Sequence, residues 1–326
     1  MASQGFKPFT YAFKEISVED LNVLTSKHNV EQEEFRNELE TDFIYLGTFG
    51  LSDPLRENIR QSIQYIKYGQ EEENSFDGNQ VNIRMVSGDH IECAKYVALQ
   101  SGIIKEEEFS QSGVFMTGDK FREEIGDYVK IWDPSAQEFR VEFGDAKKFD
   151  SIKKHLKIIA RCTAEDKFLL VAGIKQKGGL VAMTGDSIAD AEALKKADVG
   201  LCMGSGSEVA KDNSDLVILD NDFVSIHRSV KWGRAIFDNV RKFIQFQLTV
   251  NIVICTITIL GGMTLGHPPL NVIQMLWTNL IMDILGAIAI GTEPYKKDQS
   301  KSNRISRRDK ILVIEIWRQI LGQAFF

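Results

Sequence analysis

Two short segments of the sequence place a hydroxyl side chain, a glycine and an aspartate in consecutive positions. They are Ser87-Gly88-Asp89 and Thr184-Gly185-Asp186, and each follows a short apolar run. A glycine permits a tight turn, exposed backbone N–H groups and a hydroxyl can face a phosphate, and a carboxylate can hold a magnesium ion. The two triplets therefore predict a site for phosphate and magnesium.

The elements that would position these triplets alternate between strands and helices. Short β-branched runs separated by helical patterns predict an α/β fold with a doubly wound parallel sheet up to about Arg228. The predicted strands are Ile44–Phe49, Val81–Val86, Leu156–Ala160, Leu180–Met183, Val199–Cys202 and Leu216–Leu219. Ligands of such sheets bind beyond the carboxyl ends of the strands, which is where both triplets fall.

Two further segments have similar residues but a different interpretation. Thr117-Gly118-Asp119 has the same residue types without an evident paired strand before it, so we predict an ordinary turn there. Leu216–Val224 contains Asp220 in a pattern that resembles the nucleophile motif of haloacid-dehalogenase-like phosphatases. In that superfamily the nucleophile precedes the hydroxyl, lysine and acidic motifs, whereas Asp220 would follow all three. A phosphatase that uses Asp220 is therefore the least favoured hypothesis.

The distribution of charge separates a polar part of the chain from two apolar runs. The formal net charge of -7 disfavours a nucleic-acid partner, and the four cysteines show no C-x-x-C pair that would predict a zinc site. Phe243–Gly266 contains no charged residue and Leu270–Thr292 contains only Asp283. Each run can cross a hydrocarbon core of roughly 30 Å. Because basic residues flank both outer ends, we predict an integral membrane hairpin whose flanks and soluble part are cytosolic.

The second apolar run contains two side chains with oxygen atoms. Asn279 and Asp283 are four residues apart and share one helical face. A carboxylate within a membrane helix costs on the order of 2.5–3.5 kcal/mol, so a functional or paired role is the default. Both residues suit calcium, which prefers oxygen ligands, although two or three side chains do not complete its coordination shell.

One long match identifies a family. The segment Thr184–Asp222 resembles the hinge signature of P-type cation-transporting ATPases. Lys242–Asn251 is most similar to the calmodulin-regulated calcium pumps of the plasma-membrane type. Further segments resemble the family's Asp-Pro-x-Arg motif, its second phosphate-site motif and the segment that ends in its phosphate-site lysine: Gly50–Arg56, Ile83–Asp89 and Ala160–Lys167.

The resemblance implies a haloacid-dehalogenase-like phosphorylation domain with a role for each matching residue. Lys167 would stabilise charge on the phosphoryl group, Ser87 would donate its hydroxyl to that group, and Asp190 would be a neighbouring acidic residue. Asp186 would be a magnesium ligand. Taken singly, Lys167 could be a surface lysine and the aspartates could begin helices, but the ordered set favours the phosphate site. The phosphate-site loops would include Gly88, Asp89, Thr184 and Gly185.

The resemblance also implies the transported-ion residues and the domain order. Asn279 and Asp283 would match ion ligands of the sixth membrane helix, and Asn251 a polar position on the fifth, where packing is an equally good explanation. The implied segments are a remnant of the nucleotide-binding domain (1–42), an incomplete phosphorylation domain (43–230), a cytosolic stalk (231–242), two transmembrane helices (243–292), a cytosolic loop (293–310) and the start of a further helix (311–326).

The implied function is ATP-driven calcium transport through an aspartyl phosphate, with magnesium as cofactor. The bilayer would be the plasma membrane or an internal membrane, and calmodulin would regulate the parent family. The sequence contains no Asp-Lys-Thr-Gly-Thr motif, so the phosphorylated aspartate and most of the ATP site are missing from it, and enzyme activity of the chain is undecided. Ser187, Ala189 and Glu192 stand where the family pattern has Gly, Asn and Pro. Two hypotheses stay open: a part of a pump that needs the missing half, or a pseudo-pump that binds magnesium, phosphate or a full-length pump without turnover.

Overall fold

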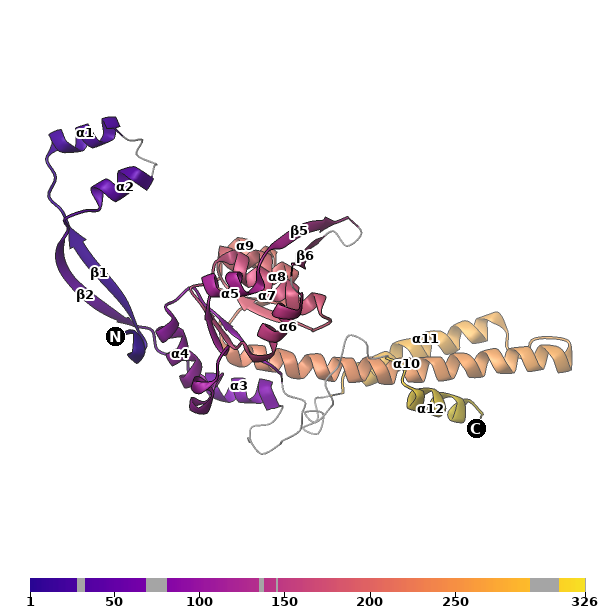
Figure 1. The fold of residues 1–326 in the computed structure, drawn as a ribbon. Coiled ribbons are helices and arrows are strands. Elements are labelled where there is room, and N and C mark those ends of the chain that lie inside the picture. The colour runs from indigo at the N-terminus through magenta and orange to yellow at the C-terminus, as the bar shows by residue number, and fades with distance from the viewer. Residues whose placement is uncertain (28–32, 69–80, 135–137, 145, 294–310, 326) are drawn as a thin grey trace. The chain divides into compact units, whose positions relative to one another are not determined.

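The computed structural model describes residues 1–27, 33–68, 81–134, 138–144, 146–293 and 311–325 (Figure 1). The chain divides into two compact units, each of which has its own strands and core. The first unit comprises Met1–Arg56, Arg84–Asp127 and Asp145–Thr163, and the second comprises Glu57–Ile83, Tyr128–Gly144 and Ala164–Phe326. The loop predicted at 293–310 lies outside the described residues from position 294 onward. The predicted domain boundaries stay a prediction.

The first unit contains a parallel sheet of three short strands in the order β3-β7-β4. β3 (Met85–Val86) and β4 (Phe115–Thr117) both pair with β7 (Ile158–Ala160), whose residues are all buried. α4 (Ile91–Gln100) and α5 (Gly118–Ile125) pack against this sheet, and α6 (Ala146–His155) packs against α5. Large apolar side chains are fully buried in this unit, among them Phe121, Ile125, Phe149, Leu156, Ile158 and Ile159. Removing them from water is the main stabilising contribution to the unit.

A long antiparallel ribbon precedes this sheet in the sequence. β1 (Phe6–Phe13) pairs with β2 (Ile44–Ser52), and α1 (Val18–Lys27) and α2 (Glu33–Leu39) lie at one end of the ribbon (Figure 1). The prediction that Ile44–Phe49 joins a parallel sheet is therefore wrong. β1 supplies an antiparallel partner, and no strand was expected there.

The prediction of an ordinary turn at Thr117-Gly118-Asp119 is also wrong. Thr117 is the last residue of β4, where it pairs with Ala160, and Gly118 begins α5. A strand of three residues is too short to display the alternation of side chains by which strands are recognised in a sequence. Two such triplets therefore lie at the carboxyl ends of strands in this sheet. One directly follows β3, and the other begins with the last residue of β4.

The second unit contains another parallel sheet, in the order β10-β9-β8. β8 (Ala182–Gly185), β9 (Val199–Met203) and β10 (Leu216–Ile218) lie within two residues of three predicted strands. The predicted α/β class with parallel strands is confirmed. In the described part of the chain, the strand hydrogen bonds form one three-stranded parallel sheet in each unit.

Helices cover the second sheet and position the loops that leave it. α7 (Ala164–Gln176) and α8 (Ala191–Lys196) pack together, and Val171 and Ala193 share a buried apolar cluster. A short 3-10 helix, η3 (Ile188–Asp190), joins β8 to α8, and α9 (Glu208–Asp212) follows β9.

A β-hairpin that no sequence pattern indicated also belongs to the second unit. β5 (Tyr128–Asp133) pairs with β6 (Glu138–Phe143). The Lys130 ammonium lies 4.7 Å from the ring centroid of Phe168 in α7, and Val141 is buried, so the hairpin packs against α7.

α10 (Phe223–Leu265) is one helix of 43 residues that continues through the predicted stalk into the first apolar run. It begins where the Val224 N–H donates to Asp222 Oδ1 at 3.0 Å, and it ends at Gly266, whose φ of 74° is left-handed. α3 (Ile59–Tyr68) packs against it.

A second apolar helix follows the turn at Gly266. α11 (Val272–Gly291) has 20 residues and is therefore about 30 Å long. By length and composition α10 and α11 could each cross a membrane, as predicted for 243–292. α12 (Ile314–Phe325) packs against α10, where Gln245 Nε2 donates to Gln319 Oε1 at 2.9 Å and Ile320 is fully buried.

We expect Gly200→Ala to destabilise the full chain by about 1–3 kcal/mol, because a Cβ there would lie 2.8 Å from the Leu194 carbonyl oxygen. Gly233→Ala is the matched control, since its Cβ would meet no atom within 4 Å and alanine favours a helix. Thermal unfolding in detergent micelles, followed by circular dichroism, measures both. Equal melting temperatures for the two variants would contradict the close packing at β9.

Candidate functional site

A cluster of polar groups lies where β8 ends in the second unit. Thr184 and Gly185 are the last residues of β8, and Asp186 and Ser187 lead into η3. The Asp186 carbonyl accepts a hydrogen bond from the Ser207 N–H at 2.8 Å, and Ser207 in turn caps α9. The loop is therefore held by β8 at its start and by the hydrogen bond from Ser207 at the start of α9. Thr184 and Asp186 are exposed on it.

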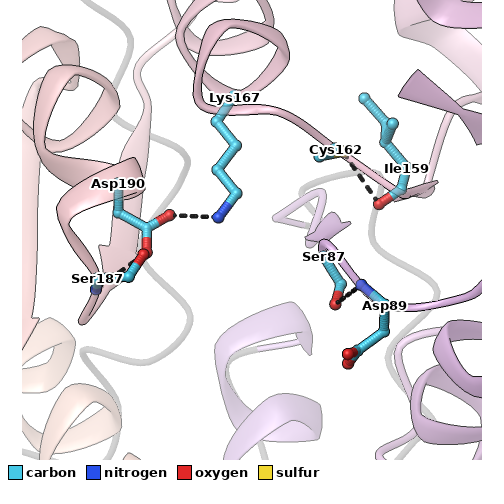
Figure 2. A network of polar contacts seen from close by, with 7 residues as sticks. All are labelled: Ser87, Asp89, Ile159, Cys162, Lys167, Ser187 and Asp190. Atoms are coloured by element: carbon cyan, nitrogen blue, oxygen red, sulfur yellow. Dashed lines mark hydrogen bonds and ion pairs between the residues drawn. The ribbon is translucent and has the colours of Figure 1, made fainter. Parts of the chain in front are cut away.

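A buried ion pair joins this loop to α7. Lys167 Nζ lies 2.7 Å from Asp190 Oδ1, with exposed side-chain fractions of 12% and 7%. Ser187 contacts the second carboxylate oxygen, because its hydroxyl lies 2.5 Å and its backbone nitrogen 3.2 Å from Asp190 Oδ2. Figure 2 shows Lys167 and Ser187 on opposite oxygens of Asp190. The second unit thus brings together the predicted residues Lys167 and Asp190, and adds Ser187.

The electrostatics of this cluster keep Asp190 ionised. Burial by itself raises the pKa of the Asp190 carboxyl, but hydrogen bonds from Lys167 and Ser187 outweigh burial, so the pKa lies below its ordinary value. A lowered pKa in the folded chain means that ionised Asp190 stabilises the fold above its unfolded pKa. That stabilisation is lost as the pH falls through the folded value.

Gly185 is required by the same cluster. A Cβ at this position would lie 2.6 Å from Asp190 Cβ and 2.8 Å from Asp190 Cγ. Ser187, which stands where the family pattern has Gly, has an ordinary φ of -101°. The steric need for glycine therefore falls on Gly185 and not on position 187.

The other predicted triplet lies in the first unit, at the end of β3. Ser87 Oγ accepts from the Asp89 N–H at 3.1 Å (Figure 2). The Ser87 carbonyl accepts from the Cys162 N–H at 3.0 Å. A Cβ on Gly88 would meet Cys162 O at an ordinary 3.8 Å, so this glycine is not sterically required. Asp89 Oδ2 lies 3.4 Å from Lys7 Nζ.

The residues of the second unit offer one carboxylate for magnesium. Among the described residues, no three or more His, Cys, Asp or Glu side chains gather as a metal-binding group. Asp186 is exposed beside the ion pair. Magnesium is often bound by one or two carboxylates together with substrate phosphates and water, so an exposed Asp186 fits that role, which stays a prediction.

The predicted ion residues lie at one level of the α10–α11 hairpin. Lys242 Nζ lies 2.5 Å from Glu293 Oε2, and a Cβ on Gly286 would lie 2.8 Å from the Phe246 ring. In these antiparallel helices, five residues beyond Phe246 is Asn251, and five residues before Gly286 is position 281. Asn251 therefore lies level with the segment 279–283.

Two amide side chains near this level of the hairpin have buried oxygen atoms. Asn279 Oδ1 is buried without a hydrogen-bond partner among the described side chains, and Asn251 is exposed. Asp283 lies in α11, but its side chain is outside the described residues. Gln247, one helical turn before Asn251, also has a buried oxygen, and no described group donates to it. Sequence analysis assigned no role to Gln247, although a polar amide within a charge-free run is itself a signal.

We expect Lys167→Met and Asp190→Asn each to lower the melting temperature of the full chain by more than the double variant does. Each single change leaves a buried partner without its counter-charge, which costs about 3 kcal/mol, whereas the double variant leaves neither. Lys211→Met is the matched control, because its partner Glu208 is exposed and such pairs contribute about 1 kcal/mol or less. Additive losses in the double variant would argue against the ion pair.

Comparison with known proteins places the chain among cation pumps. A family model described as "Cation transporting ATPase, C-terminus" matches residues 267–326. The putative calcium-transporting ATPase 13, plasma membrane-type, of Arabidopsis thaliana is 37% identical over 98% of this chain and 28% of its own length. Calcium-transporting ATPase 9 of the same organism and calcium-transporting ATPase 5 of Oryza sativa subsp. japonica, both plasma membrane-type, are each 36% identical over 88% of this chain and 24% of their own lengths.

A solved structure of the catalytic domain of the CPx-ATPase CopB-B is also similar, at 18% identity and a TM-score of 0.35. The matched region covers 58% of this chain and 50% of the CopB-B chain. The chain spans about a quarter of the length of the curated relatives named above. The relationship and the two apolar helices together indicate a membrane protein. The chain therefore belongs to the family of the plasma membrane-type calcium-transporting ATPases and aligns with about a quarter of their length.

Proposed function

We propose that the chain is part of an ATP-driven calcium transporter that forms an aspartyl phosphate. The observation that carries the proposal is the buried Lys167–Asp190 pair beside an exposed Asp186, in a chain that also contains the α10–α11 hairpin. The relatives that support calcium as the cargo are named calcium-transporting ATPases.

The phosphate-site half of the proposal assigns roles to residues of each unit. Lys167 would stabilise charge on the transferred phosphoryl group, since phosphoryl transfer depends on positioning and on cations near the equatorial oxygens. Ser87 would donate its hydroxyl, and Asp186 would hold magnesium. A bound magnesium ion would neutralise charge on the phosphoryl oxygens. Thr184, Gly185, Gly88 and Asp89 would form the loops that face the phosphate.

The acceptor of the phosphoryl group is not among these residues. The sequence contains no Asp-Lys-Thr-Gly-Thr motif, so we propose that the 326 residues do not transfer phosphate by themselves. The ATP site would also need the remaining part of a pump. The alternative is a pseudo-pump, a membrane protein that binds magnesium, phosphate or a full-length pump without turnover. The two hypotheses fit the same sequence but predict different lengths for the native polypeptide.

The membrane half of the proposal concerns α10 and α11. The Asn279 oxygen is buried and has no hydrogen-bond partner within the described part of the chain, and it lies near the level of Asn251. Such an oxygen is suited to a hard cation, for which oxygen atoms are the preferred ligands. Basic residues at both outer ends of the hairpin favour a cytosolic position for the soluble part. The hairpin itself would lie in the plasma membrane or in an internal membrane. Calmodulin would be a partner of the whole pump.

A phosphatase that uses Asp220 is disfavoured by geometry. The Ser225 hydroxyl donates to Asp220 Oδ2 at 2.5 Å, and the Asp222 N–H donates to Oδ1 at 3.2 Å. These hydrogen bonds lower the pKa of Asp220 and occupy both of its oxygens at the start of α10. The carboxylate therefore organises the helix start, and we do not assign it as a nucleophile.

A chimera tests the proposed function. This chain replaces the aligned segment of the Arabidopsis thaliana putative calcium-transporting ATPase 13, in yeast whose own calcium pumps are deleted. We expect ATP-dependent uptake of radioactive calcium into isolated vesicles. Asp283→Asn should abolish it by removing the negative charge and one oxygen, and Asn279→Ala by removing the amide oxygen. The unjoined 326-residue chain should leave uptake at background.

Cys255→Ala is the control within the chimera, since this exposed residue of α10 belongs to no proposed site. Uptake should survive that change. A chimera that reaches the membrane but takes up no calcium, or one that is indifferent to Asp283→Asn, would contradict the proposal.

A further inference from the structure

The Ser187 hydroxyl makes the shortest of the contacts to Asp190. Ser187 Oγ lies 2.5 Å from Oδ2, compared with 2.7 Å between Lys167 Nζ and Oδ1. A carboxylate that is ionised can only accept, so the hydroxyl donates. The Ser187 N–H donates to the same oxygen at 3.2 Å. Two donors from one residue therefore hold the oxygen that Lys167 does not.

This arrangement limits rotation of the carboxylate. If Oδ2 were free, the carboxylate could turn about its terminal bond, a torsion with a broad and roughly two-fold profile, and Oδ1 would leave Lys167. With Oδ2 bound to Ser187, only one plane of the carboxylate satisfies both partners, because a half-turn merely exchanges its two equivalent oxygens. Gly185 leaves room for that orientation, because a Cβ there would lie 3.1 Å from Oδ2.

Ser187 is itself held in place. The preceding residue, Asp186, accepts the 2.8 Å hydrogen bond from the Ser207 N–H, and the Asp190 N–H donates to the Ser187 carbonyl at 3.0 Å. Ser187 also has an unstrained backbone. Because these hydrogen bonds fix the loop, they also fix the position of the Ser187 hydroxyl. The hydroxyl then fixes the orientation of the Asp190 carboxylate, which holds the Lys167 ammonium.

We propose that Ser187 is a positioning residue whose hydroxyl orients Asp190 and thereby places the Lys167 ammonium at the phosphate site. The functional meaning of that placement rests on the proposed function. The contact itself does not, since it concerns three residues of one unit. A serine that only begins η3 would stabilise the loop without any effect specific to Lys167.

Competitive acylation of lysines in the full chain tests this assignment. The chain in detergent micelles is treated with a trace of isotopically labelled acetic anhydride, and the rate at each lysine is read by mass spectrometry. The Lys167 amino group reacts slowly while Asp190 holds it, because it must leave the carboxylate before the anhydride can attack it. We expect Ser187→Ala to raise the Lys167 rate by roughly threefold or more, consistent with loss of a hydrogen bond to a charged group.

Matched variants separate positioning from general loosening. Ser187→Thr keeps a hydroxyl and should restore the slow rate at Lys167. Asp190→Asn should raise the rate by itself, and adding Ser187→Ala to it should change nothing further. Lys175, also in α7 and 3.1 Å from the Lys196 carbonyl, is the internal control and should keep its rate in every variant.

Three results would overturn the assignment: an unchanged Lys167 rate in Ser187→Ala, an equal rise at Lys175, or a rise that Ser187→Thr does not reverse. The measurement needs neither ATP nor calcium. A chimera without calcium uptake, together with the expected labelling, would reject the proposed function and leave the Ser187 contact intact. Calcium uptake without the expected labelling would support the proposed function and reject the positioning role of Ser187.

Discussion

The Lys167–Asp190 ion pair is the interaction on which the polar cluster after β8 in the second unit depends. Two opposite charges withdrawn from water stabilise a fold only when each is well paired and the remaining lone pairs are satisfied. Here the ammonium takes one carboxylate oxygen and Ser187 takes the other. The pair links α7 to the loop after β8. It also explains why Gly185 has no side chain, and it leaves Asp186 exposed beside a fixed positive charge.

A different constraint governs the apolar helices. Within hydrocarbon each backbone polar group must be satisfied internally, which helices achieve, and any polar side chain then needs a reason to be there. The contacts of Lys242 with Glu293 and of Phe246 with Gly286 set the level of Asn251 against 279–283. Oxygen atoms are the ligands that a hard cation prefers, which is why these residues are proposed as its site. The phosphate-site half and the membrane half therefore each rest on their own physical argument.

Sequence reasoning succeeded where signals were long or ordered. Two long apolar runs predicted α10 and α11, and β8, β9 and β10 were placed within two residues. It failed for short or non-local features. β4 has three residues, β2 found an unexpected partner in β1, and the Ser187–Asp190 contact depends on side-chain geometry that spacing does not encode. Lys167 and Asp190 are 23 positions apart, and family resemblance, not periodicity, predicted that both belong to one site.

The central claim is that these residues work within a larger calcium-dependent phosphoryl-transfer protein. The most direct measurement isolates the native polypeptide from its own membranes with an antibody to this sequence, after exposure to radiolabelled ATP with and without calcium. The account predicts an acid-stable, hydroxylamine-sensitive label that requires calcium, on a polypeptide heavier than 36.8 kDa. A native polypeptide of 36.8 kDa that carries no label would contradict it and favour the pseudo-pump.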